Sequence, residues 1–238
     1  MIKEMICYGD LHIHSYYSNG YFHNFPPWVA STPEEILKKA KERNLKVVAI
    51  TDHDSLGGFR EAVKIAGKFG LIVIPACEVT SKDGHILAYG IKKEIPKKLG
   101  AEKTIELIHQ QGGIAVAPHP FTLLNLEKKS LGRKVFDLDL DGWETASATC
   151  FKKENLIFQK EFKMRKNLTQ TGGSDSHSLD FIGLGVTVFK KEIKTIDDVL
   201  SALKNKQTET KIIKYVQIYK KYLASFRDQF KFILRNLA

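Results

Sequence analysis

Apolar residues of this chain gather in short runs that alternate with amphipathic segments. The runs that predict β-strands are residues 5–8, 47–50, 71–76, 86–91, 114–117, 143–146, 168–171 and 184–189. Patterns with helical spacing occupy residues 33–44, 59–69, 101–111, 154–166 and 196–204. Such alternation favours an α/β fold with a mainly parallel sheet, either closed as a barrel or left open.

The first helical pattern carries its own start signal. Pro33 occupies the position where its missing N–H costs nothing. Glu34 and Glu35 follow Ser31 and Thr32, each at capping-box spacing. The inward face would consist of Ile36, Leu37 and Ala40. We expect a helix from Pro33 to about Asn44.

The final segment, residues 207–238, has an apolar stripe at helical spacing and many basic residues. We expect one long amphipathic helix there, following a domain of residues 1–206. Its apolar face would pack on that domain or on a second subunit, which would make the protein a homodimer. The alternative is a helix that contacts nucleic acid or a membrane surface.

Composition narrows the class of protein. The chain has 238 residues, 43% of them hydrophobic, which suits one sizeable domain. Its three cysteines form no Cys-x-x-Cys pair, so neither a disulfide framework nor a thiolate zinc site is indicated. No apolar run is long enough for a membrane span and the start lacks signal-peptide character, so we expect a cytoplasmic protein with no membrane partner.

Charge adds a weaker indication. Lys and Arg number 37 against 27 Asp and Glu, a net charge of +10. A basic surface would attract an anionic substrate. The ordinary alternative is that lysine is abundant on solvated helix faces.

Histidine and carboxylate clusters follow several strand-like runs. They are Asp10-Leu11-His12-Ile13-His14, Thr51-Asp52-His53-Asp54, Pro118-His119-Pro120 and Gly173-Ser174-Asp175-Ser176-His177. In α/β folds the carboxyl ends of the strands meet on one face, so these clusters would share a pocket. His12 and His14 would point to the same side of a strand, as a shared metal requires. Nitrogen and oxygen donors suit Zn, Mn or Fe.

Each cluster by itself also has a simpler interpretation. A lone His-x-His pair occurs by chance, and an aspartate before a helix is an ordinary cap. Asp10 and Asp52 would orient imidazoles through the ring nitrogen that faces away from the metal. Asp54 is the first candidate for the acid that protonates the leaving group, with a loop or cap role as the alternative.

Together, in this order, the motifs resemble those of the polymerase and histidinol phosphatase (PHP) family of metal-dependent phosphoesterases. The resemblance extends to about Phe189 and includes the strand that ends in Glu78. It implies a distorted seven-stranded (β/α)7 barrel, similar to a TIM barrel, with two or three divalent metals at the carboxyl ends of its strands.

The resemblance also implies a ligand set. His12, His14, Glu78 and Asp175 would surround one metal. Glu78 would bridge to a second metal held by His119 and His85. A third would bind His53 and His177. Where many family members have Asp or His to complete that trinuclear site, this chain has Asn19. Either the third site is weakly occupied or His23 replaces the donor.

The expected activity is therefore hydrolysis of a phosphomonoester or phosphodiester by a metal-bridged hydroxide. The substrate would be a nucleotide, an oligonucleotide or a small phosphorylated metabolite, and histidinol phosphate is one alternative. The alternative from another class is a non-catalytic PHP-like module that binds nucleic acid or protein. Such a module would have to keep a cluster of buried polar groups without a metal, which is energetically unfavourable.

Overall fold

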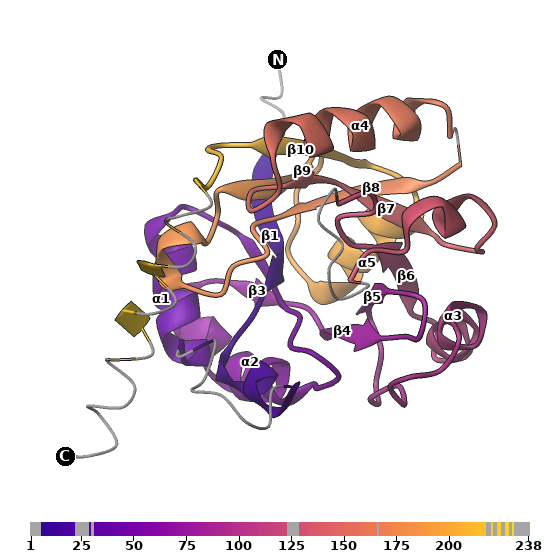
Figure 1. Cartoon of the computed structure of the whole chain (residues 1–238). Coiled ribbons are helices and arrows are strands. Elements are labelled where there is room, and N and C mark those ends of the chain that lie inside the picture. Colours follow the sequence, from indigo (N-terminus) through magenta and orange to yellow (C-terminus); the bar gives the residue numbers. More distant parts are fainter. Residues whose placement is uncertain are drawn as a thin grey trace.

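The structure is a computed structural model, and it describes residues 6–21, 29, 31–122, 129–165, 167–217, 220, 223–224, 227–228 and 230. Within that part of the chain, the strands form two five-stranded sheets and five α-helices cover them (Figure 1). The α/β class predicted from the alternating runs is confirmed.

The first sheet has the order β10-β9-β1-β2-β3 and the second the order β4-β5-β6-β7-β8. The first contains β1 (Cys7–Ile13), β2 (Val47–Ile50), β3 (Ile72–Val73), β9 (Gly185–Phe189) and β10 (Thr208–Ile212). The second contains β4 (Ala76–Thr80), β5 (His85–Tyr89), β6 (Ile114–Ala117), β7 (Gly142–Ser147) and β8 (Thr169–Gly173).

A closed barrel with regularly alternating strands and helices is not found among the described strands. The pairs β4–β5, β5–β6 and β1–β9 are antiparallel. Residues 81–84 join β4 to β5 directly, as only an antiparallel pair allows, whereas the connection from β5 to β6 contains α3. The two sheets meet instead through two isolated parallel bridges, Ile13 with Ser176 and His53 with Glu78. Both bridges involve segments of the histidine and carboxylate clusters.

The run at residues 71–76 forms two strands rather than one. Pro75 separates β3, which pairs with β2, from β4, which pairs with β5. Proline has no N–H to donate to a sheet, so the ladder is interrupted at that residue. The interruption moves the chain from the first sheet to the second.

The helices lie close to their predicted positions. They are α1 (Pro33–Glu42), α2 (Gly57–Phe69), α3 (Ala101–Gln110), α4 (Lys152–Lys163) and α5 (Ile196–Lys204). Three short 3-10 helices are η1 (Tyr16–Tyr21), η2 (Gly132–Phe136) and η3 (Leu179–Phe181). The Thr32–Glu35 capping box of α1 is present, and its predicted inward face is buried.

The predicted helix from residue 207 is wrong at its start, because Thr208–Ile212 is strand β10 and pairs antiparallel with β9. Burial alternates along it, with Thr208 buried and Glu209 exposed, which is the two-residue period of a strand. Thr208 also donates its hydroxyl to the carbonyl of Gln170 on β8 (2.7 Å). Helical residues appear further on, at 220, 223–224, 227–228 and 230.

No helix in the described ranges is long and apolar enough to cross a membrane. Apolar side chains instead fill the space beneath the helices. One core cluster joins Leu37 of α1, Ile50 of β2 and Ala62 of α2, and another surrounds Trp143 of β7. These clusters fix the strands whose ends carry the polar residues.

Candidate metal centre

The eight donors implied by the sequence come together in one place. They are His12, His14, His53, Glu78, His85, His119, Asp175 and His177. His12 and Glu78 lie within strands β1 and β4, and His85 begins β5. The others follow the ends of β1, β2, β6 and β8. The two bridges between the sheets, Ile13 with Ser176 and His53 with Glu78, therefore bring residues far apart in sequence to one edge.

Glu78 is the centre of the cluster and is almost completely buried. Its Oε2 lies 3.2 Å from His14 Nε2, 3.4 Å from His12 Nε2 and 3.4 Å from His53 Nδ1. Its Oε1 lies 3.0 Å from His85 Nδ1 and 3.5 Å from His119 Nε2. One carboxylate thus faces five imidazoles, three of them near Oε2 and two near Oε1.

Asp175 forms a second meeting point at the outer side. Its Oδ1 lies 3.5 Å from His14 Nε2 and 3.6 Å from both His12 Nε2 and His177 Nδ1. Its Oδ2 accepts a hydrogen bond from the Thr149 hydroxyl (2.8 Å). Asp175 therefore connects the His12–His14 pair with His177.

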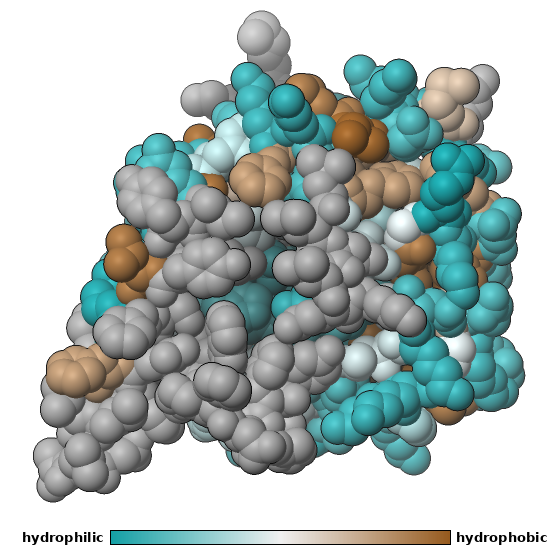
Figure 2. Space-filling view, in the orientation of Figure 1, coloured by the Kyte–Doolittle hydropathy of each residue, from teal (hydrophilic) through white to brown (hydrophobic). Residues whose placement is uncertain are grey.

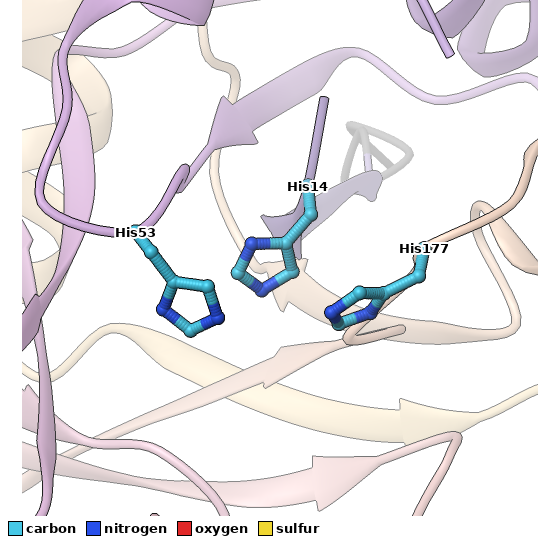
Figure 3. A group of neighbouring side chains, drawn as sticks. All are labelled: His14, His53 and His177. Atoms are coloured by element: carbon cyan, nitrogen blue, oxygen red, sulfur yellow. The ribbon is translucent and has the colours of Figure 1, made fainter. Parts of the chain in front are cut away.

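The donors fall into four overlapping triplets in which one ligand atom from each residue lies within 4.8 Å of the others. The triplets are His12-Glu78-His119, His53-Glu78-His85, His12-His14-Asp175 and His14-His53-His177. Figure 3 shows the three imidazoles of the last triplet side by side, with ring centroids 4.7 and 4.4 Å from that of His14.

This donor set fits divalent transition metals. Every member offers a nitrogen or a carboxylate oxygen, the atoms that Zn, Mn and Fe accept. His119 Nδ1 is buried and has no hydrogen-bond partner within the described ranges. A buried imidazole with an unused nitrogen is costly unless something else satisfies it. The arrangement is therefore compatible with a site for more than one ion.

Burial and neighbouring charges shift the pKa values of several side chains in the cluster. Burial alone would raise the pKa of Glu78, but the imidazoles of His85, His12 and His53 hold that pKa well below its usual range. Burial would lower the pKa of His12, yet Glu144 and Glu78 raise it well above the ordinary value. The pKa of His53 is well below its ordinary value because burial dominates. The cluster thus favours an ionised Glu78.

Two donors sit on strained backbone. His119 has φ of 30° and Asp175 has φ of 49°, a region that residues other than glycine rarely adopt. The amide of His119 donates to Glu144 Oε2 (2.9 Å), and the hydroxyl of Thr149 holds the Asp175 side chain. Such strain persists where surrounding contacts enforce it, often at functional sites.

Comparison with known sequences agrees with this geometry. The sequence model of the PHP domain matches residues 10–132, more than half of the chain, and a PHP-associated region matches residues 159–208. The chain belongs to the PHP domain family. Six of the eight donors lie within the first matched region. Asp175 and His177 lie within the second.

Two relatives match parts of the chain. The uncharacterized protein MJ1587 of Methanocaldococcus jannaschii is 44% identical over 142 residues, which cover 58% of this chain and 81% of that protein. A 3',5'-nucleoside bisphosphate phosphatase of Chromobacterium violaceum is 34% identical over 100 residues, covering 40% of this chain and 32% of that protein. This second match thus spans about a third of the phosphatase.

Solved structures share the fold. A two-domain protein of Bacteroides vulgatus with a predicted PHP-like metal-dependent phosphoesterase superposes with a TM-score of 0.69 at 19% identity, covering 87% of this chain and 65% of that one. The lesion-specific endonuclease PfuEndoQ of Pyrococcus furiosus gives a TM-score of 0.63 at 22% identity, covering 87% of this chain and 58% of that one.

Sequence reasoning missed Glu144, which lies in the middle of β7 and is buried. Its Oε1 accepts from His12 Nδ1 (3.1 Å), while its Oε2 accepts from the amide of His119. A glutamate inside the strand-like run 143–146 was the available signal, because a buried carboxylate needs partners. Glu144 links two donors of this PHP site from behind.

Asp52 acts on a donor through a serine. Its Oδ1 accepts from the Ser18 hydroxyl (2.7 Å), and Ser18 Oγ lies 3.0 Å from His14 Nδ1. The amide of His53 also donates to Ser18 Oγ (3.2 Å). Asp52 was expected to contact an imidazole directly, whereas the structure inserts Ser18 between them.

Asp10 contacts backbone rather than imidazole. It accepts from the amides of His12 (3.3 Å), Ser174 (2.9 Å) and Gly183 (2.7 Å). Burial raises the pKa of Asp10 to about 6, although these hydrogen bonds oppose the shift. These hydrogen bonds hold together the two segments that carry His12 and Asp175.

Asp54 caps a strand. Its Oδ1 accepts from the amide of Thr80 at the end of β4 (2.7 Å), and its own amide donates to the Glu78 carbonyl (3.0 Å). These contacts match the loop interpretation of this residue. The remaining two predicted residues are not placed: His23 lies outside the described residues, as does the side chain of Asn19.

Proposed function

We propose that this PHP protein is a metal-dependent hydrolase of phosphate esters. The observation that carries the proposal is the single buried carboxylate of Glu78 facing five imidazoles. A cluster of this kind is costly to maintain without a cation to satisfy it. Membership of the PHP domain family and relatives named as phosphatase, diphosphodiesterase and exoribonuclease support the same chemistry.

We propose two or three divalent ions, Zn, Mn or Fe. His12, His14, Asp175 and Glu78 would hold the first ion. Glu78, His85 and His119 would hold the second, and His53 with His177 a third. The four overlapping triplets support this sharing of donors. When bound, such ions polarise phosphoryl oxygens and lower the pKa of water, which is the basis of the expected metal-bridged hydroxide.

The chain's own residues would position these donors. Glu144 fixes the ring of His12, Ser18 and Asp52 fix that of His14, and Thr149 fixes the carboxylate of Asp175. Asp54 remains the proposed acid for the leaving group, and its bond to Thr80 would also fix its position. Each role would keep a reacting group within a narrow range of geometry.

The proposed substrate is a nucleotide, an oligonucleotide or a small phosphorylated metabolite. The net charge of +10 suits an anionic substrate. A relative named as a nucleoside bisphosphate phosphatase and a structural neighbour solved as endonuclease Q with a duplex substrate point in the same direction. Histidinol phosphate stays an alternative substrate.

We also propose that residues 1–206 make up the catalytic PHP unit, extended by β10, and that the chain acts in the cytoplasm. The distorted seven-stranded ring of the family would correspond here to β1, β2 and β4–β8, joined at the two bridged seams. A homodimer through the C-terminal residues remains a prediction. Exposed Leu223 and Phe230 support it, because apolar side chains on one segment favour association.

The test combines metal content with hydrolysis. Purified protein is assayed for bound metal by elemental analysis and for turnover of aryl phosphate mono- and diesters with added Mn or Zn. We expect two or more ions and turnover that a chelator abolishes. The double variant His12→Ala/Asp175→Ala should lose both metal and turnover. A wild-type protein that stays metal-free and inactive after reconstitution would favour the non-catalytic binding module instead.

A further inference from the structure

The loop that carries two donors is contacted from outside by residues near the C-terminus. We call residues 174–180 the ligand loop, since they include Asp175 and His177. The C-terminal residues in question are 213–217, 224 and 227–228, beyond both matched family regions, which end at 132 and 208. We propose that these residues position the ligand loop, and thereby His177, for metal binding.

A partly buried hydrogen bond connects the two segments. The Ser178 hydroxyl donates to Asp228 Oδ2 (2.6 Å), and Ser178 is only 2% exposed. Ser178 directly follows His177 in the chain. A short hydrogen bond from a hydroxyl to a carboxylate is among the stronger polar contacts. This bond therefore restrains the backbone next to His177.

An ion pair supports that bond from the solvent side. Arg227 Nη1 lies 3.0 Å from Asp180 Oδ2, and Arg227 Nε donates to Asp228 Oδ1 (2.9 Å). The side chains of Arg227 and Asp180 are 45% and 52% exposed, so this pair contributes little by itself. Its effect is to orient Asp228 toward Ser178.

An apolar contact fixes two segments that adjoin the ligand loop. Ala224 and Val216 pack on Ala148, Phe181 and Leu184. The amide of Val216 donates to the carbonyl of Ala148 (3.0 Å). Ala148 precedes Thr149, whose hydroxyl holds Asp175. The C-terminal residues thus support both segments that determine where Asp175 lies.

The inner side of the ligand loop is already fixed by the core of the site. The amide of His14 donates to the Ser176 carbonyl (2.9 Å), and the amide of Ser174 donates to Asp10. His177 lies beyond these contacts, and its side chain is 21% exposed. His177 Nδ1 lies 3.1 Å from the Asp175 carbonyl, and the Ser178–Asp228 contact adds restraint from the outer side. Loss of that restraint should affect the His14-His53-His177 triplet more than the triplets around Glu78.

The first experiment measures amide hydrogen exchange in the full-length, metal-free protein. Asp228→Ala removes the carboxylate that accepts the hydrogen bond of the Ser178 hydroxyl. Asp197→Ala, at an exposed position of α5, is the matched control. We expect about tenfold faster exchange in residues 175–181 of Asp228→Ala, with β6 unchanged. The control should exchange like wild type. Because no metal is present, this result does not depend on the proposed function.

The second experiment titrates Mn²⁺ into the same variants. We expect Asp228→Ala to weaken the most weakly bound ion about tenfold while the tighter ions keep their affinity. Asp228→Glu should restore most of that affinity. Ser178→Ala should have the same effect as Asp228→Ala, and the double variant should be no worse than either, as expected for one shared contact.

Unchanged exchange in residues 175–181 of Asp228→Ala would overturn the proposal, whatever the metal titration gives. Equal weakening of all ions would also overturn it, because that pattern indicates general destabilisation. If wild-type protein binds no metal while the ligand loop still exchanges faster in Asp228→Ala, the positioning contact stands and the proposed hydrolase fails.

Discussion

Glu144 Oε1 lies 3.1 Å from His12 Nδ1, so the strands β7 and β1 are joined across the interior by a carboxylate and an imidazole. With Nδ1 used in this way, Nε2 of His12 faces Glu78 and Asp175. The other oxygen of Glu144 accepts from the amide of His119. One residue thus sets the orientation of two donors that lie 107 positions apart, from 12 to 119.

Replacing Glu144 should weaken metal binding without removing any donor. Glu144→Gln keeps the size of the side chain but loses the charge that favours an Nδ1-protonated His12. We expect metal affinity to fall about 10- to 100-fold, as is common for groups that orient ligands. Calorimetric titration with Zn²⁺ or Mn²⁺ measures it. Glu209→Gln on the exposed face of β10 is the control, and equal affinities of the two variants would exclude an orienting role.

Ser18 should matter more than an ordinary serine near a helix. Its hydroxyl connects Asp52 with His14 and also accepts the amide of His53. Ser18→Ala removes one hydrogen bond to the buried Asp52, which keeps those from the Ser15 amide and hydroxyl (2.6 Å each), so we expect a cost of about 1 kcal/mol in stability. We expect a lower midpoint in chemical unfolding together with weaker metal binding. Ser201→Ala on α5 should alter neither, and a normal titration of Ser18→Ala would disprove the connection.

Loss of the Glu78 charge should abolish the centre. Glu78→Gln leaves five imidazoles around a neutral amide. The two triplets that contain residue 78 then lose their carboxylate. We expect at least about 100-fold slower phosphate ester hydrolysis and a lower metal content. Elemental analysis and a steady-state assay of the same preparation test this. Glu106→Gln, at an exposed position of α3, serves as the control. Retained metal and turnover in Glu78→Gln would contradict the proposed bridging role.

Metal should stabilise the folded chain. An ion present at a hundred times its dissociation constant contributes about 2.7 kcal/mol per site. For a domain of this size that corresponds to a rise in Tm of about 5–10 °C. Differential scanning calorimetry with and without Mn²⁺ measures the shift. His12→Ala/Asp175→Ala should show none, and an equal shift in that variant would indicate binding elsewhere on the surface.

Two glycines of α2 provide a matched pair. A Cβ at Gly58 would lie 2.1 Å from Asp52 Oδ2, whereas one at Gly67 would meet nothing within 4 Å. Gly58→Ala should destabilise the protein by about 1–3 kcal/mol because the crowded Asp52 must move. Gly67→Ala should stabilise it by up to about 1 kcal/mol, since alanine favours the helix. Thermal unfolding of both variants decides, and a stabilising Gly58→Ala would show that Asp52 moves freely.

Local patterns determined much of the fold before tertiary contacts were known. The helix starts and the strand cores followed from signals a few residues apart, such as the Thr32–Glu35 capping box and the apolar run 47–50. Strand pairing could not be inferred in this way. Whether β5 runs antiparallel to β4, or Thr208–Ile212 joins β9, depends on partners far away in the chain.

The site divides along the same line. Side-chain type and spacing pointed to the clusters that contain His12, His53, His119 and Asp175 as candidate donors. The resemblance to the PHP family added Glu78 and His85. Their supporting residues were invisible in sequence: Glu144 resembled an isolated glutamate in a strand, and Ser18 an ordinary serine. Only the tertiary structure brought Glu144 behind His12, Ser18 beside Asp52 and Asp228 onto Ser178. Orientation is a property of contacts between distant segments, so sequence alone could name the candidate ligands but not what holds them in place.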